Sequence, residues 1–172
     1  MKLWICALTF AGFAVAQSGD PIMKTVLARY NYVKQNLVES AEVMPEENYE
    51  YRLSPAQRPW AEWIEHNVAM NYRFCSQIAG QEVPKEAVPP GKSKPELVAA
   101  LKKSFAYCDP IFTAMTDAKA VQPVTMGSRT IYPVSAMIDL LIQWNEHYGN
   151  MVGYLRTKGI TPPSTARAQK KQ

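Results

Sequence analysis

The stretch PVSAMIDLLIQWNEHYGNMVGYLRTKG, from Pro133 to Gly159, decides the fold class because its apolar residues recur with the period of an α-helix. Pro133 suits a first helical turn, and Gly159 suits the end of a helix. The pattern predicts an amphipathic helix over about residues 133–158 with one buried face. The stripe that forms this face consists of Val134, Met137, Ile138, Leu141, Trp144, Tyr148, Met151, Val152 and Leu155.

Three earlier segments have the same helical period. They cover about residues 21–44, 59–79 and 93–115. Pro21 opens the first, Gly80 closes the second, and Ser93 with Glu96 forms a capping box at the start of the third. Pro110 lies inside the third segment, where it removes a backbone donor and crowds the preceding turn. A kink or an early break is expected there.

These four segments predict an all-α protein, a four-helix bundle. No segment of strand length alternates between apolar and polar residues, and no repeat of fixed period is present. The connections before the second and fourth helices are a dozen residues or more in length. Tight antiparallel hairpins need less, so crossover connections are possible.

The first residues resemble a secretory signal peptide. Lys2 precedes an apolar run from Leu3 to Val15, and a small-x-small pattern ends at Ala16. The run is too short for a membrane span, which needs about 20 apolar residues, so an uncleaved anchor is disfavoured. We expect residues 1–16 to be removed, leaving a secreted or periplasmic protein with no membrane association.

Composition indicates a single globular domain. The chain has 172 residues, of which 47% are hydrophobic and 20% charged, and the expected domain covers 17–165, followed by a basic flexible tail over 166–172. The formal charge of +4 falls to +3 without Lys2. Basic and acidic residues alternate and form no basic stripe, so binding to nucleic acid is not expected.

The only two histidines, His66 and His147, lie at the edges of the apolar faces of the second and fourth helices. They could converge in a cleft of the bundle and bind a metal ion, with Gln143, Glu62 or water completing the ligands. They could equally be solvated or hydrogen-bonded residues of structural importance only. Spacing by itself leaves both interpretations open.

Two asparagines, Asn67 and Asn71, lie one turn apart near the centre of the apolar face of the second helix. Buried amides need hydrogen-bond partners. They could bind the backbone of a loop, or they could line a polar pocket with Trp144 and Tyr154.

Cys75 and Cys108 remain after signal cleavage, and both lie on apolar faces. In an oxidising compartment they could form a disulfide, and two buried free thiols are the alternative. A catalytic cysteine is disfavoured, because neither lies on the same helix face as a histidine.

Three segments together resemble the DinB-like superfamily of DinB/YfiT type, particularly its exported bacterial members. They are WAEWIEHNVAMNYRFCSQIAG (60–80), ELVAALKKSFAYCDPIF (96–112) and NEHYGNMVGYLRTKGITPPST (145–165). The resemblance implies a four-helix bundle with up-down-down-up connectivity. It also implies a divalent metal, nickel or zinc, held by three histidines, one on the second helix and two spaced H-x-x-x-H on the fourth.

Carried onto this chain, that ligand set falls on His66, Gln143 and His147. The middle position departs from the family pattern, because an amide is a poorer transition-metal ligand than an imidazole. Some members of the wider superfamily are transferases or isomerases that use low-molecular-weight thiols. Such thiols are cytoplasmic, which sets that activity apart from an exported chain.

Two functions are therefore open. The first is an exported DinB-like metalloenzyme of unknown reaction, with a divalent-metal site formed by two histidines and Gln143 or water. The second is a non-catalytic bundle that binds a small molecule or a protein in the same cleft without metal. The aromatic second helix could also support a homodimer.

Overall fold

The computed structural model describes residues 19–87, 93–126 and 128–171. The expected signal peptide, residues 1–16, lies outside the described residues. The four segments with helical periodicity form α1 (Pro21–Val43), α2 (Trp60–Ala79), α3 (Lys94–Thr113) and α5 (Pro133–Thr157). Each boundary lies within about two residues of the one predicted, because the local capping residues specify it.

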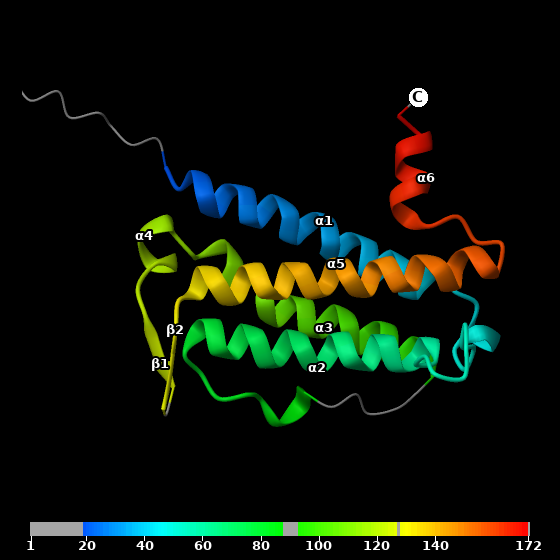
Figure 1. The fold of residues 1–172 in the computed structure, drawn as a ribbon, viewed down its shortest axis with the longest axis horizontal. Coiled ribbons are helices and arrows are strands. Elements are labelled where there is room, and N and C mark those ends of the chain that lie inside the picture. The colour runs from blue at the N-terminus through cyan, green and yellow to red at the C-terminus, as the bar shows by residue number, and fades with distance from the viewer. Residues whose placement is uncertain (1–18, 88–92, 127, 172) are drawn as a thin grey trace, which may run out of the picture.

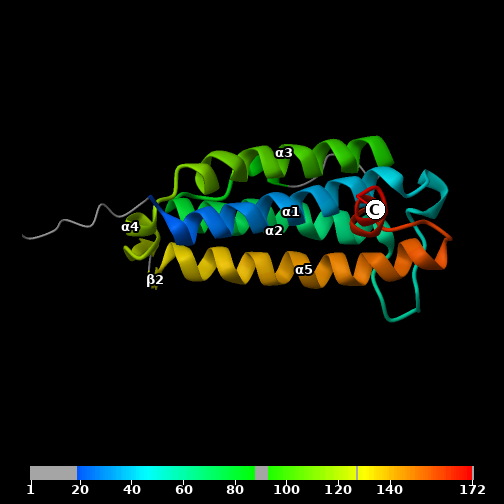
Figure 2. The same ribbon diagram turned by 90° about the horizontal axis from the view of Figure 1, so that it is seen from above.

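The helices form a bundle with up-down-down-up connectivity. Figure 1 shows α1 and α5 running in one direction along the bundle and α2 and α3 in the other. Because α2 and α3 run in the same direction, α3 begins at the same end of the bundle as α2 (Figure 1). Both α3 and α5 pack against α1 and α2, as the view from above in Figure 2 shows. The histidine-bearing helices α2 and α5 are thus neighbours.

The core lies along the shared axis of these helices. Its largest fully buried side chains are mainly aromatic, and they include Tyr30, Trp60, Phe105, Phe112, Trp144 and Tyr154. The buried face of α5 differs from the predicted stripe: Ile138 is 45% exposed, whereas Leu140 is fully buried. The correct face is centred on Leu140, Trp144 and His147, so part of the predicted stripe was wrong. The apolar residues of this helix extend around more than one face, which makes the periodicity ambiguous.

Helix ends follow the expected chemistry at two places. Gly80 terminates α2 with a φ of 66°, a left-handed conformation that glycine adopts without steric cost. At the start of α3 the Glu96 carboxylate accepts a hydrogen bond of 3.2 Å from the Ser93 backbone N–H. The helix α3 continues through Pro110 and ends at Thr113, so the proline does not cause an early break.

Short elements fill the connections. They are the 3-10 turns η1 (Glu46–Asn48) and η2 (Lys85–Ala87), α4 (Asp117–Ala120), and an antiparallel hairpin of β1 (Val124–Met126) and β2 (Arg129–Ile131). The sequence predicted a loop at the hairpin, because three-residue strands offer too few positions for alternation to be recognised. None of the described helices is both long and apolar enough to cross a lipid bilayer.

The segment after α5 contains a further helix, α6 (Pro163–Gln169), which extends into the region predicted to be a flexible tail from residue 166. The prediction of a flexible tail was wrong there because contacts with α1, which the sequence does not show, hold this helix. The Arg167 side chain binds the carboxylate of Glu39 and the amide oxygen of Asn36, both on α1. The sequence suggested that the charge of Arg167 would be solvated, but its side chain is partly buried against α1, which lies far away in the chain.

Candidate functional site

The structure brings His66 of α2 and His147 of α5 together. Their ring centres are 4.9 Å apart and the ring planes are inclined by 54°. His147 is only 5% exposed, while His66 is half-buried. The pair lies at the interface between α2 and α5, a region that we call the histidine groove. The two histidines that the sequence placed on different helices thus face one another across a helix interface.

Asn67 orients the ring of His147. The Asn67 amide nitrogen donates to the backbone oxygen of Trp63 at 2.7 Å, which fixes the direction of the amide. Its oxygen lies 3.1 Å from Nδ1 of His147 and can act only as an acceptor. The proton of a neutral His147 is therefore on Nδ1, and Nε2 carries the lone pair. Metal-binding histidines are generally oriented by such a bond at the second ring nitrogen.

Aromatic and cationic groups surround the pair. The Trp63 ring centre is 5.3 Å from that of His147, and the Arg58 guanidinium lies 5.2 Å from the Trp63 ring centre. The Nε1 atom of Trp63 is buried and has no hydrogen-bond partner among the described residues. The histidine groove therefore combines two imidazoles with an unused indole donor and a positive charge.

Both imidazoles are neutral at pH 7. Burial, together with the charges of His66 and Arg58, lowers the pKa of His147 to about 4. Burial also lowers the pKa of His66, and there the cationic contributions come from Arg58 and Arg73. A neutral imidazole offers a lone pair to a metal or to a proton donor. The same arginines, however, oppose the entry of a cation.

The two imidazoles are spaced so that they can occupy two ligand positions of one divalent ion. Two imidazoles bound to one ion at about 2.1 Å have ring centres about 4.6–5.3 Å apart for angles between square and tetrahedral. The observed 4.9 Å lies within that interval. No third histidine, cysteine, aspartate or glutamate of the described chain completes a group with them, which removes Glu62 as a ligand. Gln143, half-buried one turn before His147, is left as the protein donor for a third position.

The other expected pocket residues belong to the core. Asn71 is fully buried, receives a hydrogen bond of 2.8 Å from Trp144 Nε1 and donates one of 2.9 Å to Ser104 Oγ. Trp144 and Tyr154 are also fully buried. The Tyr154 hydroxyl donates to the backbone oxygen of Arg58. Of the four residues, only Asn67 contacts the histidine pair.

Cys75 and Cys108 are joined by a disulfide that links α2 to α3, with Cα atoms 5.5 Å apart. Both residues are fully buried where α2 and α3 face one another. The sequence left a disulfide and two free thiols open, because the distance between the two helices is a tertiary property. The bond lies on a different face of α2 from the histidine pair and has no part in it.

Comparisons with known proteins agree with this geometry at the level of fold. No protein-family model matches the chain, and no curated protein does. A DinB-like protein from Bacillus cereus superposes with a TM-score of 0.67 at 18% identity, over 81% of this chain and 95% of that one. The DinB-like protein YjoA from Bacillus subtilis superposes with a TM-score of 0.64 at 16% identity, over 80% and 93%.

The chain has the DinB-like fold. A conserved protein from Enterococcus faecalis also superposes, with a TM-score of 0.60 at 10% identity over 78% of this chain and 95% of that one. At these identities the likeness is one of fold. The resemblance seen in the three sequence segments is confirmed to that extent.

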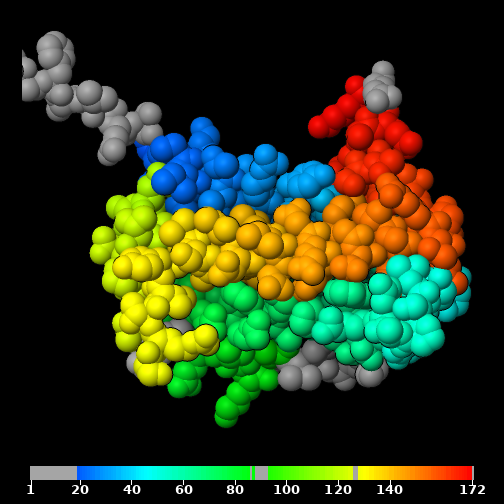
Figure 3. All heavy atoms as spheres, viewed as in Figure 1, coloured from blue at the N-terminus to red at the C-terminus, as the bar shows by residue number. Residues whose placement is uncertain are grey.

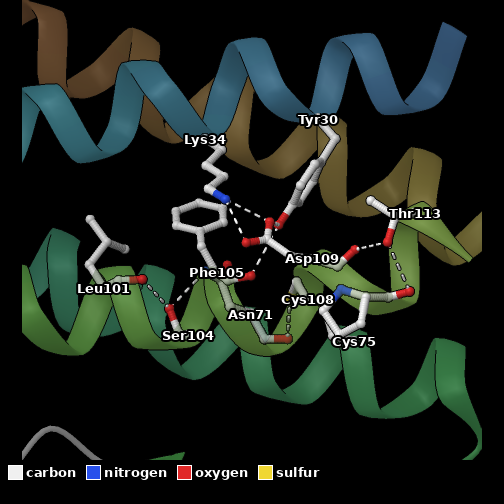
Figure 4. Close-up of polar contacts among 11 residues, drawn as sticks. Tyr30, Lys34, Asn71, Cys75, Leu101, Ser104, Phe105, Cys108, Asp109 and Thr113 are labelled. Carbon is white, nitrogen blue, oxygen red and sulfur yellow. Dashed lines mark hydrogen bonds and ion pairs between the residues drawn. A yellow bond between two sulfur atoms is a disulfide. The ribbon is translucent and has the colours of Figure 1, made fainter. Parts of the chain in front are cut away.

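The DinB-like bundle also contains a polar cluster that the sequence did not reveal. Figure 4 shows Tyr30 and Lys34 of α1 pointing toward Asp109 of α3. Lys34 Nζ lies 2.6 and 2.7 Å from the two carboxylate oxygens, and the Tyr30 hydroxyl donates to one of them at 2.7 Å. Burial and the bond to Asp109 raise the pKa of Tyr30 far above its usual value. The one sequence signal for this cluster is the position of a charged residue, Asp109, in an apolar segment next to Pro110.

Proposed function

We propose that this DinB-like chain holds a divalent transition-metal ion, nickel or zinc, in the histidine groove. His66 and His147 Nε2 would be its ligands, and Gln143 or water would complete the coordination. The observation that carries the proposal is the 4.9 Å separation of the two imidazoles. Asn67 supports it, because its amide leaves Nε2 of His147 as the nitrogen with the free lone pair.

A bound ion would supply Lewis-acid chemistry and would lower the pKa of a coordinated water. The residues of the chain perform supporting tasks. Asn67 holds the His147 ring in place, and Trp63 packs against that ring and excludes water from it. Arg58 adds a positive charge beside the site, which favours an anionic ligand. We therefore expect a small anionic or polarised molecule as the partner of the site.

We also propose that the protein is exported. The charged and apolar start of the chain supports this, since it has the pattern of a signal peptide. The disulfide between Cys75 and Cys108 supports it as well, because disulfides persist in the periplasm and outside the cell. Absence of the protein from both the periplasmic fraction and the culture medium, or a chain that retains residues 1–16 after expression, would contradict export.

The metal proposal is tested by titrating chelator-treated protein with zinc and with nickel by calorimetry. The wild type should take up one ion, and His66→Ala or His147→Ala should abolish uptake. Gln143→His should tighten zinc binding at least about tenfold, because it supplies a third imidazole on the same face. Ile142→His is the matched control, since Ile142 is 59% exposed on the neighbouring face of α5 and should change nothing.

Two results would contradict the proposal. One is the absence of uptake at micromolar metal by both the wild type and Gln143→His. The other is an equal gain in zinc affinity in Gln143→His and Ile142→His, which would show that any added histidine binds metal on the surface. Retention of wild-type affinity in His147→Ala would have the same meaning.

A second function, a groove that binds an anionic ligand without metal, is favoured by one specific observation. Arg58 and Arg73 both act on the histidine pair, and Trp63 Nε1 is a buried donor without a partner among the described residues. This combination is favourable for an anion and unfavourable for a cation. Failure of the metal titration together with anion-dependent shifts of the Trp63 indole resonance would establish this function instead.

A further inference from the structure

A separate cleft lies at the hairpin end of the bundle. Its walls come from the last turns of α2, from strand β2 and the residue after it, and from the first two turns of α5. Its volume is about 770 Å³, a size typical of small-molecule sites. Figure 3 shows the hairpin and the start of α5, in yellow, beside the green end of α2. We call it the hairpin cleft; it includes neither His66 nor His147.

The walls of the hairpin cleft are held in place by packing. A Cβ atom added at Gly80 would lie 3.0 Å from Val124 Cγ1, so β1 packs closely against the end of α2. Within the hairpin, Thr125 pairs with Thr130, and their hydroxyl oxygens are 3.1 Å apart. The strand that carries Arg129 is therefore fixed relative to α2 by its partner strand, and the cleft exists without a ligand.

The charges in the hairpin cleft are not neutralised by the protein. Arg73 and Arg129 both line it, and neither side chain forms an ion pair or hydrogen bond with the part of the chain that the structure describes. The Arg73 guanidinium lies 4.9 Å from the ring centre of Phe74, which also lines the cleft. Asp139, on the α5 side, is likewise unpaired within the described chain. Opposite charges that share a cleft without meeting leave room between them for a ligand.

Apolar surface accompanies these charges. Phe74 and Ile131 are half-buried, and Ala136 is buried at the base of α5. A ligand that fits must therefore present an apolar body to these side chains and a negative group to the two guanidinium groups. Arginine binds carboxylates with paired hydrogen bonds from its planar fork, whereas a neutral amide of the same shape forms only weaker ones.

We propose that the hairpin cleft binds a small organic carboxylate, with the carboxylate between Arg73 and Arg129 and the apolar body against Phe74 and Ile131. The proposal does not depend on a metal at the histidine pair, since no lining residue of the cleft is one of the proposed ligands. Arg73 links the two regions electrostatically, because its charge also lowers the pKa of His66.

The test uses benzoate and benzamide as probes, which have the same ring and differ in charge. The full chain labelled with ¹⁵N is titrated with each, once with a chelator and once with zinc, so that failure of the metal proposal cannot affect the result. Benzoate should shift the amides of residues 74–77, 129–132 and 134–136 in both conditions, and benzamide should bind at least about tenfold more weakly. Equal binding of the two probes, or shifts confined to other surfaces, would overturn the proposal.

Single substitutions test which arginine charges contribute to benzoate binding. Arg73→Gln and Arg129→Gln should each weaken benzoate binding by about 5- to 10-fold, because each removes a charge-assisted hydrogen bond. Arg156→Gln removes the same charge from the exposed far end of α5 and should leave binding unchanged. Asp139→Asn should tighten it by a few-fold, since it removes like charge. An equal loss in Arg156→Gln would show that benzoate follows net charge alone, which would sink the assignment.

Discussion

Asn67 and Asn71 lie one turn apart on α2 and are both buried, yet their hydrogen bonds lead to different regions. Asn71 connects Trp144 of α5 to Ser104 of α3, so its network closes inside the core. Asn67 connects the backbone of Trp63 to Nδ1 of His147, and the other ring nitrogen, Nε2, forms no hydrogen bond with the described residues. A closed polar network serves stability, whereas an open one leaves a group available for chemistry.

The disulfide belongs to the core, like the closed hydrogen-bond network of Asn71, and its removal should have the largest effect on stability. Cys75→Ala with Cys108→Ala releases a loop of 33 residues and should lower the free energy of unfolding by about 3–4 kcal/mol. Urea denaturation measures the loss. Zinc affinity, measured by calorimetry on the folded variant, should be unchanged. A large loss of affinity would mean that the two faces of α2 are coupled.

Substitution of Asn71 should be next in size. Asn71→Ala leaves the buried indole N–H of Trp144 without its acceptor and also creates a small cavity, at a cost of about 2–3 kcal/mol. Asn145→Ala is the matched control, because the Asn145 amide bonds to the backbone of Leu141 on an exposed face. Its cost should be below about 0.5 kcal/mol in the same urea experiment. Equal costs would show that burial of the Asn71 network contributes nothing.

The contrast between these two asparagines also shows where prediction from sequence ends. Helix boundaries were predictable because Pro21, Gly80 and the Ser93–Glu96 pair are local signals. The two asparagines lie on one helix face, and nothing in the sequence shows that one faces a core tryptophan and the other a histidine. Their partners lie 73 and 80 residues away, and such distances are set by packing.

The same reason explains the remaining differences from the sequence prediction. Helix α6 depends on the contacts of Arg167 with α1, more than a hundred residues earlier in the chain. The positions of His66 and His147 on two helix faces made their proximity a hypothesis, and the family resemblance supported it, but spacing alone left it open. The hairpin cleft could not be predicted at all, because it depends on how β1 packs against Gly80.

Asn67→Ala tests the open network of Asn67 and His147, and its effect on stability should be smaller than that of Asn71→Ala. The variant removes the acceptor of His147 Nδ1–H, at a cost of about 1–2 kcal/mol. Its effect on zinc affinity should be large, a loss of about 10- to 100-fold, because the ring is no longer held in the tautomer that leaves Nε2 free. Asn71→Ala supplies the control, and a comparable loss of affinity there would erase the distinction between the two networks.

The smallest expected effect is the pH dependence of stability that His147 confers. Its pKa is lowered to about 4 in the folded chain by burial, His66 and Arg58, while the unfolded chain takes up the proton near the ordinary value of 6.5. The stabilisation is thus complete above pH 6.5 and is lost as the pH falls toward 4. By pH 6 the loss should be less than about 1 kcal/mol. Chemical denaturation between pH 7.5 and pH 6 measures it, and NMR titration should place the His147 transition near 4. In His147→Gln only the shallower pH dependence of stability due to His66 should persist. If the free energy of unfolding varied with pH as in the wild type, proton uptake by His147 would not be linked to unfolding.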